Sequence, residues 1–404
     1  MSKLRLKIGI ISLSFMSMSA LVVTNAYSAI IADFPNEPIA KIQMIGTIPS
    51  LGSLITTLFV GVLAMKCPKK ILALFGILLT AIGGLVPIFF HSSINLLLGF
   101  ALILGIGIGF MNTLSPMLLS EYFEGEERAG LMGIGTAITS LGSVVMMLGG
   151  GLLGASNWQN TYYIFLITIL IFLLVLINLP MDKIIQKTAA DKKSQPALAP
   201  IDVLKSMSKL IFVIAGLSFF MSFIYTIYPS NLSILINHKE IGGTSTTGLV
   251  NAIGTVGGFI AGFSLKYINR VTKDKTLALG FLSLALTFLI SRFSSTVLTM
   301  SIGAILSGFA MAMVMATIPY YISLKARPFE IAIAMSVFQF LNSLGGIFSP
   351  IILSWLTINP GEQAFLFGGI ACVIISLIVL VTNIGKRTLN QAPLDKDSLS
   401  QVQS

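Results

Sequence analysis

Twelve long apolar runs constrain the fold of this chain more than any other feature of its sequence. A helix needs about 20 apolar residues to cross the hydrocarbon core of a bilayer, and lipid offers no partner to an unpaired backbone group. The first six runs cover residues 8–32, 42–64, 71–90, 94–119, 131–153 and 159–179. The second six cover residues 210–236, 247–268, 275–291, 296–322, 331–357 and 364–384. The sequence therefore predicts an all-α membrane protein with 12 transmembrane helices in two six-helix bundles.

The composition excludes most soluble classes of protein. Of 404 residues, 55% are hydrophobic and only 10% are charged, against about 25% charged residues in soluble domains. The net charge of +10 is scattered over alternating loops without a basic face, so we expect no nucleic-acid partner. Cys67 lies in a basic loop and Cys372 in an apolar run, so we predict no disulfide, metal site or cofactor.

The basic residues predict the orientation of the helices. If every run spans the membrane, 22 of the 25 Lys and Arg residues fall on the side of the N-terminus. The other three are Lys41, Lys239 and Arg292. Because positively charged loops stay in the cytoplasm during insertion, we predict a plasma-membrane protein with both termini cytoplasmic. A cleaved signal peptide is the alternative for the first run, and the poor cleavage site around Asn25 argues against it.

Polar segments divide the chain into two parts of similar length. The longest internal polar stretch, 181–208, carries Lys, Asp and Pro residues and predicts a cytoplasmic linker. It separates an N-terminal six-helix bundle at 1–180 from a C-terminal one at 209–385. The final segment, 386–404, is polar and predicts a disordered cytoplasmic tail.

The first cytoplasmic loop carries a pattern that points to a known family. Residues 61–70 read Gly-Val-Leu-Ala-Met-Lys-Cys-Pro-Lys-Lys. This segment resembles the signature of the major facilitator superfamily between its second and third helices, Gly-x-Leu-Ala-Asp-Arg-x-Gly-Arg-Lys. The matching residues are Gly61, Leu63, Ala64, Lys66, Lys69 and Lys70. Because Met65 replaces the acidic residue and cannot pair with an arginine, we expect a weaker cytoplasmic latch, with the lysines mainly fixing the topology.

Glycines in the fourth and fifth runs add to this resemblance. Residues 105–110 read Gly-Ile-Gly-Ile-Gly-Phe, similar to the family's glycine-rich fourth helix. The fifth run has the spacing of its antiporter motif at Gly133, Gly142, Gly150 and Gly151. Ala101 and the pair Met146-Met147 replace the arginine and the Gly-Pro of these motifs, which argues against proton antiport. The resemblance implies alternating access and assigns gate or conformational roles to Gly61, Lys66, Gly105, Gly109, Gly142 and Gly150.

The runs contain no ionisable residue near their middle, which favours a neutral or amphipathic solute. The resemblance implies a cavity lined mainly by the first, fourth, seventh and tenth spans, with the second, fifth, eighth and eleventh around them. Polar or aromatic residues on these helices are then the candidates for substrate binding. They are Asn25, Ser28, Asn112, Ser115, Tyr225, Tyr228, Asn231, Gln339 and Asn342. The alternative for each is a structural role, because Asn and Gln join helices and Tyr is common at membrane interfaces.

Asp33, at the outer end of the first run, is the candidate for proton coupling. A partly desolvated carboxyl can load and release a proton near neutral pH. The alternative, which we favour, is an ordinary carboxylate at the membrane interface. Arg292 is likewise expected to be an interfacial anchor rather than a substrate ligand.

These features together predict a monomeric secondary transporter that works by alternating access. The predicted partners are a small-molecule substrate and membrane lipid, with protons as a candidate coupling ion. The uncharged runs slightly favour export, and a nutrient importer, a facilitator or a solute exchanger of the same fold are the alternatives. A membrane sensor that does not transport is the alternative from another class. We predict no enzyme, because the sequence shows no nucleophile–base pair, metal-ligand cluster or phosphate loop.

Overall fold

The structure, a computed structural model, describes residues 3–123, 125–181, 204–327 and 330–390, and these residues form helices without any strand. The first half contains α1 (Lys3–Ser14), η1 (Ser19–Ala26), α2 (Tyr27–Asp33), α3 (Ile39–Lys66), α4 (Lys69–Leu85), η2 (Val86–Ile88), α5 (Ile94–Tyr122), α6 (Gly125–Leu153), η3 (Trp158–Leu166) and α7 (Ile167–Asn178). The second half contains α9 (Lys209–His238), α10 (Thr244–Thr272), η5 (Lys273–Lys275), α11 (Thr276–Phe293), α12 (Val297–Lys325), α13 (Ile331–Trp355), α14 (Glu362–Val381) and α15 (Ile384–Asn390).

Each of the twelve apolar runs coincides with a helix or with consecutive helical segments, so the all-helical membrane fold is confirmed. Within the described residues, nine helical stretches are long and apolar enough to cross a membrane. The runs at 42–64, 131–153 and 247–268 correspond to α3, α6 and α10, each 28 or 29 residues long. The count of twelve spans is consistent with this arrangement.

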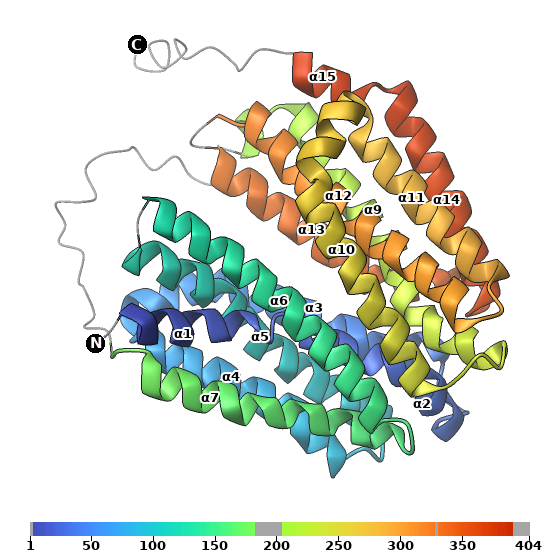
Figure 1. The fold of residues 1–404 in the computed structure, drawn as a ribbon, viewed down its shortest axis with the longest axis horizontal. Coiled ribbons are helices and arrows are strands. Elements are labelled where there is room, and N and C mark those ends of the chain that lie inside the picture. The colour runs from blue at the N-terminus through green and yellow to red at the C-terminus, as the bar shows by residue number, and fades with distance from the viewer. Residues whose placement is uncertain (1–2, 124, 182–203, 328–329, 391–404) are drawn as a thin grey trace.

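Each half has its own hydrophobic core. The buried side chains of one cluster run from Ile10 to Leu179 and those of the other from Met207 to Ile384. Figure 1 shows the two groups of helices meeting at the lower right and diverging toward the upper left, on the side where α1 begins and α15 ends. The side that carries these chain ends is called the terminal side below, and the opposite side, where the halves meet, is called the closed side.

Most of the predicted linker lies outside the described residues, and its last part packs on the second half. The Ser206 hydroxyl donates to Glu330 Oε1 at 3.2 Å, and Met207 is buried in the second core. The prediction of a disordered tail from residue 386 is wrong for residues 386–390, because α15 continues to Asn390 and buries Thr388. The rest of the tail, 391–404, lies outside the described residues.

The first span is broken, which the sequence analysis did not predict. The α-helix ends at Ser14, residues 15–18 form turns, and the chain continues as a 3₁₀-helix from Ser19. Four serines between residues 12 and 19 explain the break, because serine hydroxyls compete for backbone hydrogen bonds. The carbonyl of Ser14 accepts a hydrogen bond from the N–H of Ser17 within the turn and another from Thr139 of α6 at 3.0 Å, so a neighbouring helix supports the broken segment.

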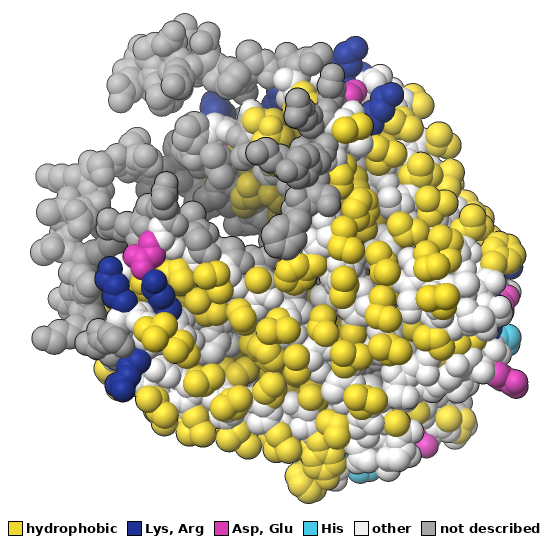
Figure 2. Space-filling model, in the orientation of Figure 1, with side chains coloured by type: hydrophobic (Ala, Val, Ile, Leu, Met, Phe, Trp, Pro, Cys, Tyr) yellow, Lys and Arg dark blue, Asp and Glu magenta, His cyan; other side chains and the backbone are white. Residues whose placement is uncertain are grey.

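Hydrophobic side chains cover both halves on the face in Figure 2, and Lys and Arg gather mainly at its left and top. Leu170 and Ile177 of α7 are among the exposed aliphatic residues of the protein. A broad apolar surface with basic side chains gathered on one side of it is typical of a protein whose middle lies in lipid.

The ion pairs described on the terminal side each join residues of the same half. Lys69 Nζ lies 2.6 Å from Glu121 Oε2, and Lys7 Nζ lies 2.7 Å from Glu127 Oε1. In the second half, Arg327 donates to the carboxylate of Glu330, which is only 1% exposed. Lys69 pairs with α5 and Lys70 donates to a carbonyl of α7 at 2.7 Å, so both lysines also join helices of the first half, and their role in fixing the topology stays a prediction.

Candidate functional site

A cavity of about 270 Å³ lies between the two halves, and five helical segments line it. Its walls come from the broken first span, from α3 and α5 of the first half, and from α9 and α13 of the second. Polar lining residues are Ser17, Thr24, Thr47, Ser50, Ser53, Asn112, Ser222, Tyr225, Thr226, Ser230, Gln339, Asn342 and Ser343. This cavity is called the central cavity below.

The central cavity is polar but uncharged. None of its described lining residues is an Asp, Glu, Lys, Arg or His, and hydroxyl and amide groups supply its polar surface. Asn342 Oδ1 is buried there without a hydrogen-bond partner. Pro49 and Pro229 also line the cavity, and each removes an N–H from the middle of its helix. The site therefore presents hydroxyl and amide side chains with which a solute can form hydrogen bonds.

Four of the nine predicted binding residues meet in this cavity: Asn112, Tyr225, Gln339 and Asn342. Gln339 and Asn342 share one face of α13, as their i, i+3 spacing predicts. The expectation that the tenth span lines the cavity is wrong for the described residues, because α12 packs on α10 and α11 instead. The second and eleventh spans, α3 and α13, line it directly.

Three other predicted residues, Asn25, Ser28 and Asn231, lie on the closed side in contacts between the halves. Asn251 of α10 donates to Asn25 Oδ1 at 2.8 Å, and the Ser28 and Ser233 hydroxyls lie 3.0 Å apart. The Ser233 hydroxyl also donates to the carbonyl of Asn25 at 3.0 Å. These residues join helices, which is the structural alternative that the sequence left open.

The sequence analysis missed the polar contacts that Gln43 of α3 makes with the other half. Its Nε2 donates to the carbonyl of Ser230 at 3.0 Å and to Asn231 Oδ1 at 3.2 Å. Gln43 is 3% exposed and Asn231 is 1% exposed. A lone amide near the start of an apolar run was the available signal for Gln43, and the same signal was present at Asn251.

Between residues whose side chains are described, every hydrogen bond that joins the halves lies on the closed side. All of these contacts are uncharged. The structure therefore shows the halves joined on the closed side by amides and hydroxyls, whereas the three ion pairs of Lys7, Lys69 and Arg327 described on the terminal side each lie within one half.

The remaining two predicted binding residues lie outside the central cavity. Ser115 is buried between helices of the first half, where its hydroxyl lies 2.9 Å from that of Ser14. Tyr228 is 2% exposed and packs against Phe288 and Phe365 in the core of the second half. Neither side chain lines the central cavity, because each points into the core of its own half.

Asp33 and Arg292 also lie away from the central cavity. Asp33 is exposed at the end of α2, and its carboxylate accepts a hydrogen bond from Trp158 Nε1 of the same half. Arg292 donates to the carbonyl of Glu362 at 3.1 Å at the closed-side end of α11. These positions suit an interfacial carboxylate and an interfacial anchor, the alternatives favoured from the sequence.

The predicted gate residues divide by location. Gly61 lies near the end of α3, and Lys66, its last residue, is exposed on the terminal side. A Cβ at Gly105 or Gly109 would overlap α3, and one at Gly142 or Gly150 would overlap the broken first span. These four glycines permit close helix packing within the first half. Their gating role stays a prediction.

The family model of the Major Facilitator Superfamily matches residues 8–273 and 266–401. The chain belongs to this superfamily. The resemblance of the motif at residues 61–70 is thereby confirmed, and the protein is a transporter of the superfamily's type.

Two relatives within the superfamily are named as probable nitrate transporters NarT. The one from Staphylococcus carnosus (strain TM300) is 22% identical over 334 residues, covering 76% of this chain and 78% of the relative. The one from Staphylococcus epidermidis (strain ATCC 35984 / RP62A) is 26% identical over 343 residues, covering 76% and 80%. Neither name describes an efflux protein, so the expectation of export gains no support.

Solved structures of the superfamily's fold superpose on nearly the whole chain. A variant of the nucleoside transporter NupG has a TM-score of 0.76 at 14% identity, covering 94% of this chain and 99% of the other. A POT family transporter in complex with 5-aminolevulinic acid has a TM-score of 0.69 at 13% identity, covering 94% and 95%. At these identities the likeness supports the fold.

Proposed function

We propose that the protein moves a small, uncharged, polar solute across the plasma membrane by alternating access. The terminal side is the cytoplasmic side in this proposal, as the distribution of Lys and Arg predicts. The structure is then the inward-facing conformation, with the outer side fastened by the contacts of Asn25 and Gln43. The two halves would rock about the central cavity to expose it to either side.

The observation that carries this proposal is the chemistry of the central cavity. Both halves contribute hydroxyl and amide groups, and Asn342, one of the lining residues, has a buried Oδ1 without a hydrogen-bond partner that a rotation of its side chain would turn toward a solute. An unsatisfied buried acceptor costs free energy, and a solute that donates a hydrogen bond would remove that cost. The polar lining favours a hydrophilic solute over the amphipathic one that the sequence also allowed.

We propose uptake rather than export, driven by the solute gradient or by exchange. The described lining holds no titratable Asp, Glu or His through which a proton gradient could act directly on the cavity. Nitrate is the second candidate solute, because the relatives from the two Staphylococcus species are named for it. A monovalent anion would have to rely on hydroxyls and backbone dipoles here, since the described cavity offers no Lys or Arg.

Purified protein and proteoliposomes test the proposal with three probes: uridine, glucose and nitrate. A solute that binds the folded state raises the free energy of unfolding by mass action, by about 2.7 kcal/mol at a hundred times its Kd, and the unfolding temperature rises with it. We expect stabilisation by a neutral probe and counterflow of its labelled form without any ion gradient. Stabilisation and counterflow by nitrate alone would overturn the neutral-solute proposal in favour of the anion.

A further inference from the structure

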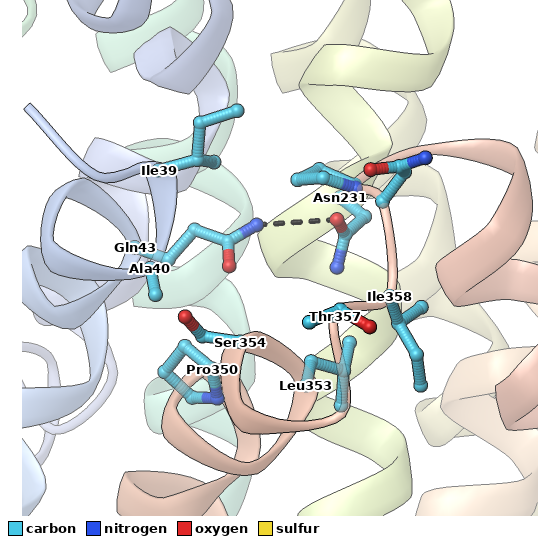
Figure 3. Close-up of a pocket in the computed structure, with 11 residues that line it drawn as sticks. Ile39, Ala40, Gln43, Asn231, Pro350, Leu353, Ser354, Thr357 and Ile358 are labelled. Carbon is cyan, nitrogen blue, oxygen red and sulfur yellow. Dashed lines mark hydrogen bonds between the residues drawn. The ribbon is translucent and has the colours of Figure 1, made fainter. Parts of the chain in front are cut away.

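A second pocket, of about 250 Å³, lies on the closed side between the two halves. Ile39, Ala40 and Gln43 of α3 form one wall, and Asn231 of α9 lies opposite them (Figure 3). Pro350, Leu353 and Ser354 of α13, together with residues 357–360, complete it. This space is called the outer pocket below.

The outer pocket and the central cavity lie along the same three helices. On α3, Gly46 and Thr47 of the central cavity follow Gln43 by about one turn. The same step separates Gly346 from Pro350 on α13, and on α9 the neighbours Ser230 and Asn231 line one space each. The two spaces are therefore successive compartments of one path between the halves.

The partition between the two compartments is the amide contact of Gln43. Its Nε2 donates to Asn231 Oδ1, the bond dashed in Figure 3, and to the carbonyl of Ser230. Asn231 Oδ1 also accepts from the backbone N–H of Gly361 at 3.2 Å, so the partition ties α3 and α9 to the segment before α14. The Gln43 Oε1 points away from Asn231, toward the side of the pocket formed by Ser354 (Figure 3).

The lining of the outer pocket offers the same chemistry as the central cavity. Its polar groups are amides and hydroxyls, those of Gln43, Asn231, Ser354, Thr357 and Asn359, and none of its described lining residues is charged. Thr357 follows the end of α13 with a φ of 54°, the left-handed conformation in which many helices end, and so turns the chain along the wall of the pocket.

We propose that the outer pocket is a second binding site for the transported solute, reached from outside before the halves open. This inference rests on the proposed function, because the solute is the same uncharged, polar molecule. A solute in the outer pocket would offer new partners to the amides of Gln43 and Asn231. Exchange of their mutual hydrogen bond for bonds to the solute would loosen the partition and admit the solute to the central cavity.

Cysteine protection tests this site, since the chain has only two cysteines, Cys67 and Cys372, to replace. In that background Ser354→Cys places a thiol in the outer pocket, and its modification by a membrane-impermeant methanethiosulfonate is followed from the outer side. Uridine and glucose are the probes. We expect one of them to slow the modification several-fold with saturation. Ser92→Cys, on an exposed outer loop away from the pocket, is the matched control and should be unaffected.

Two further variants separate the possible causes of protection. Asn342→Ala should weaken binding of the solute in the central cavity. Protection of the thiol at Ser354→Cys should persist in this background. Gln43→Leu keeps the size of the side chain but removes its amide, and the concentration of probe that gives half-protection should rise about threefold, as expected for one lost hydrogen bond inside a membrane protein.

Protection that disappears with Asn342→Ala would mean that the solute acts from the central cavity alone, and would overturn the outer site. Absence of protection by either probe, while wild-type counterflow persists, would overturn the outer site and leave the proposed function standing. Absence of both protection and counterflow would overturn the proposed function, and the outer site with it.

Discussion

The crossing of α6 and α10 on the closed side should control which side of the protein is open. A Cβ at Gly248 would lie 2.6 Å from the carbonyl oxygen of Met147 and 2.8 Å from the Cα of Gly151. Both atoms belong to backbone of the opposite half and cannot move aside alone. We therefore expect Gly248→Ala to push the halves apart on the closed side and to favour the opposite conformation.

The size of this effect follows from the overlap. An extra methyl group in a well-packed contact costs about 1–3 kcal/mol, and about 1.4 kcal/mol changes an equilibrium constant tenfold. The ratio of the closed to the open arrangement on this side should fall by a factor between about five and a hundred. The carbonyl of Met147 also accepts a hydrogen bond from Asn25 of its own half at 3.0 Å, and Asn25 Oδ1 accepts one from Asn251 of the other half at 2.8 Å, so the displacement also strains this contact between the halves.

Distances between spin labels on the two halves measure this shift. Ser92 and Asn237 are exposed near the closed side, one on each half, and suit labelling after Cys67 and Cys372 are replaced. The distance distribution of Gly248→Ala should gain a longer component. Gly216→Ala in α9 is the control, because a Cβ there meets nothing within 4 Å. An unchanged distribution in a Gly248→Ala protein that folds as the wild type does would refute the reasoning.

Four further predictions follow from single side chains. Asn342→Ala should weaken solute binding severalfold without changing the unfolding temperature of the solute-free protein, as titration by thermal shift would show. Asp33→Asn should leave solute counterflow and any pH-driven accumulation of solute intact, because Asp33 lies outside the central cavity. If the variant loses its pH-driven accumulation, Asp33 is the proton-coupling residue after all. Glu330→Ala removes the buried carboxylate that pairs with the partly exposed Arg327 and should lower the unfolding temperature by several degrees, because hydrogen bonds between charged groups contribute about 1.5–3 kcal/mol. The hydrogen bond from Lys7 holds the pKa of the Glu127 carboxyl below its usual range. The contribution of this ion pair to the free energy of unfolding is therefore present at neutral pH and is lost as the pH falls through the lowered pKa. Lys7→Met should accordingly destabilise the protein at pH 7 and have little effect at pH 3.

The sequence predicted the helices better than their interruptions. Apolar length alone located each span, because lipid requires a continuous run whatever the neighbours are. The break after Ser14 depends on a tertiary contact, the hydrogen bond from Thr139, which a reading of one segment cannot reveal. The serines before and after the break were its only local sign.

For the site, residue type predicted polarity but not location. Asn112 and Gln339 face the central cavity, whereas Asn25 and Asn231, with the same chemistry, fasten the halves together. The difference depends on the rotation of each helix about its axis and on its depth, which tertiary packing sets. Gln43 was missed because it stands alone at the start of its run, where it looked like a boundary residue.

The break in the first span gives its two pieces different neighbours. The segment α1 packs against α5, α6 and α7 of its own half, whereas η1 and α2 also contact α9 of the other half. Because the two pieces have different neighbours, a bend at residues 15–18 would let the outer piece move while the inner piece keeps its contacts. When the outer side opens, η1 and α2 could then tilt about this bend. The outer entrance to the central cavity would widen by this local movement before either bundle tilts as a whole.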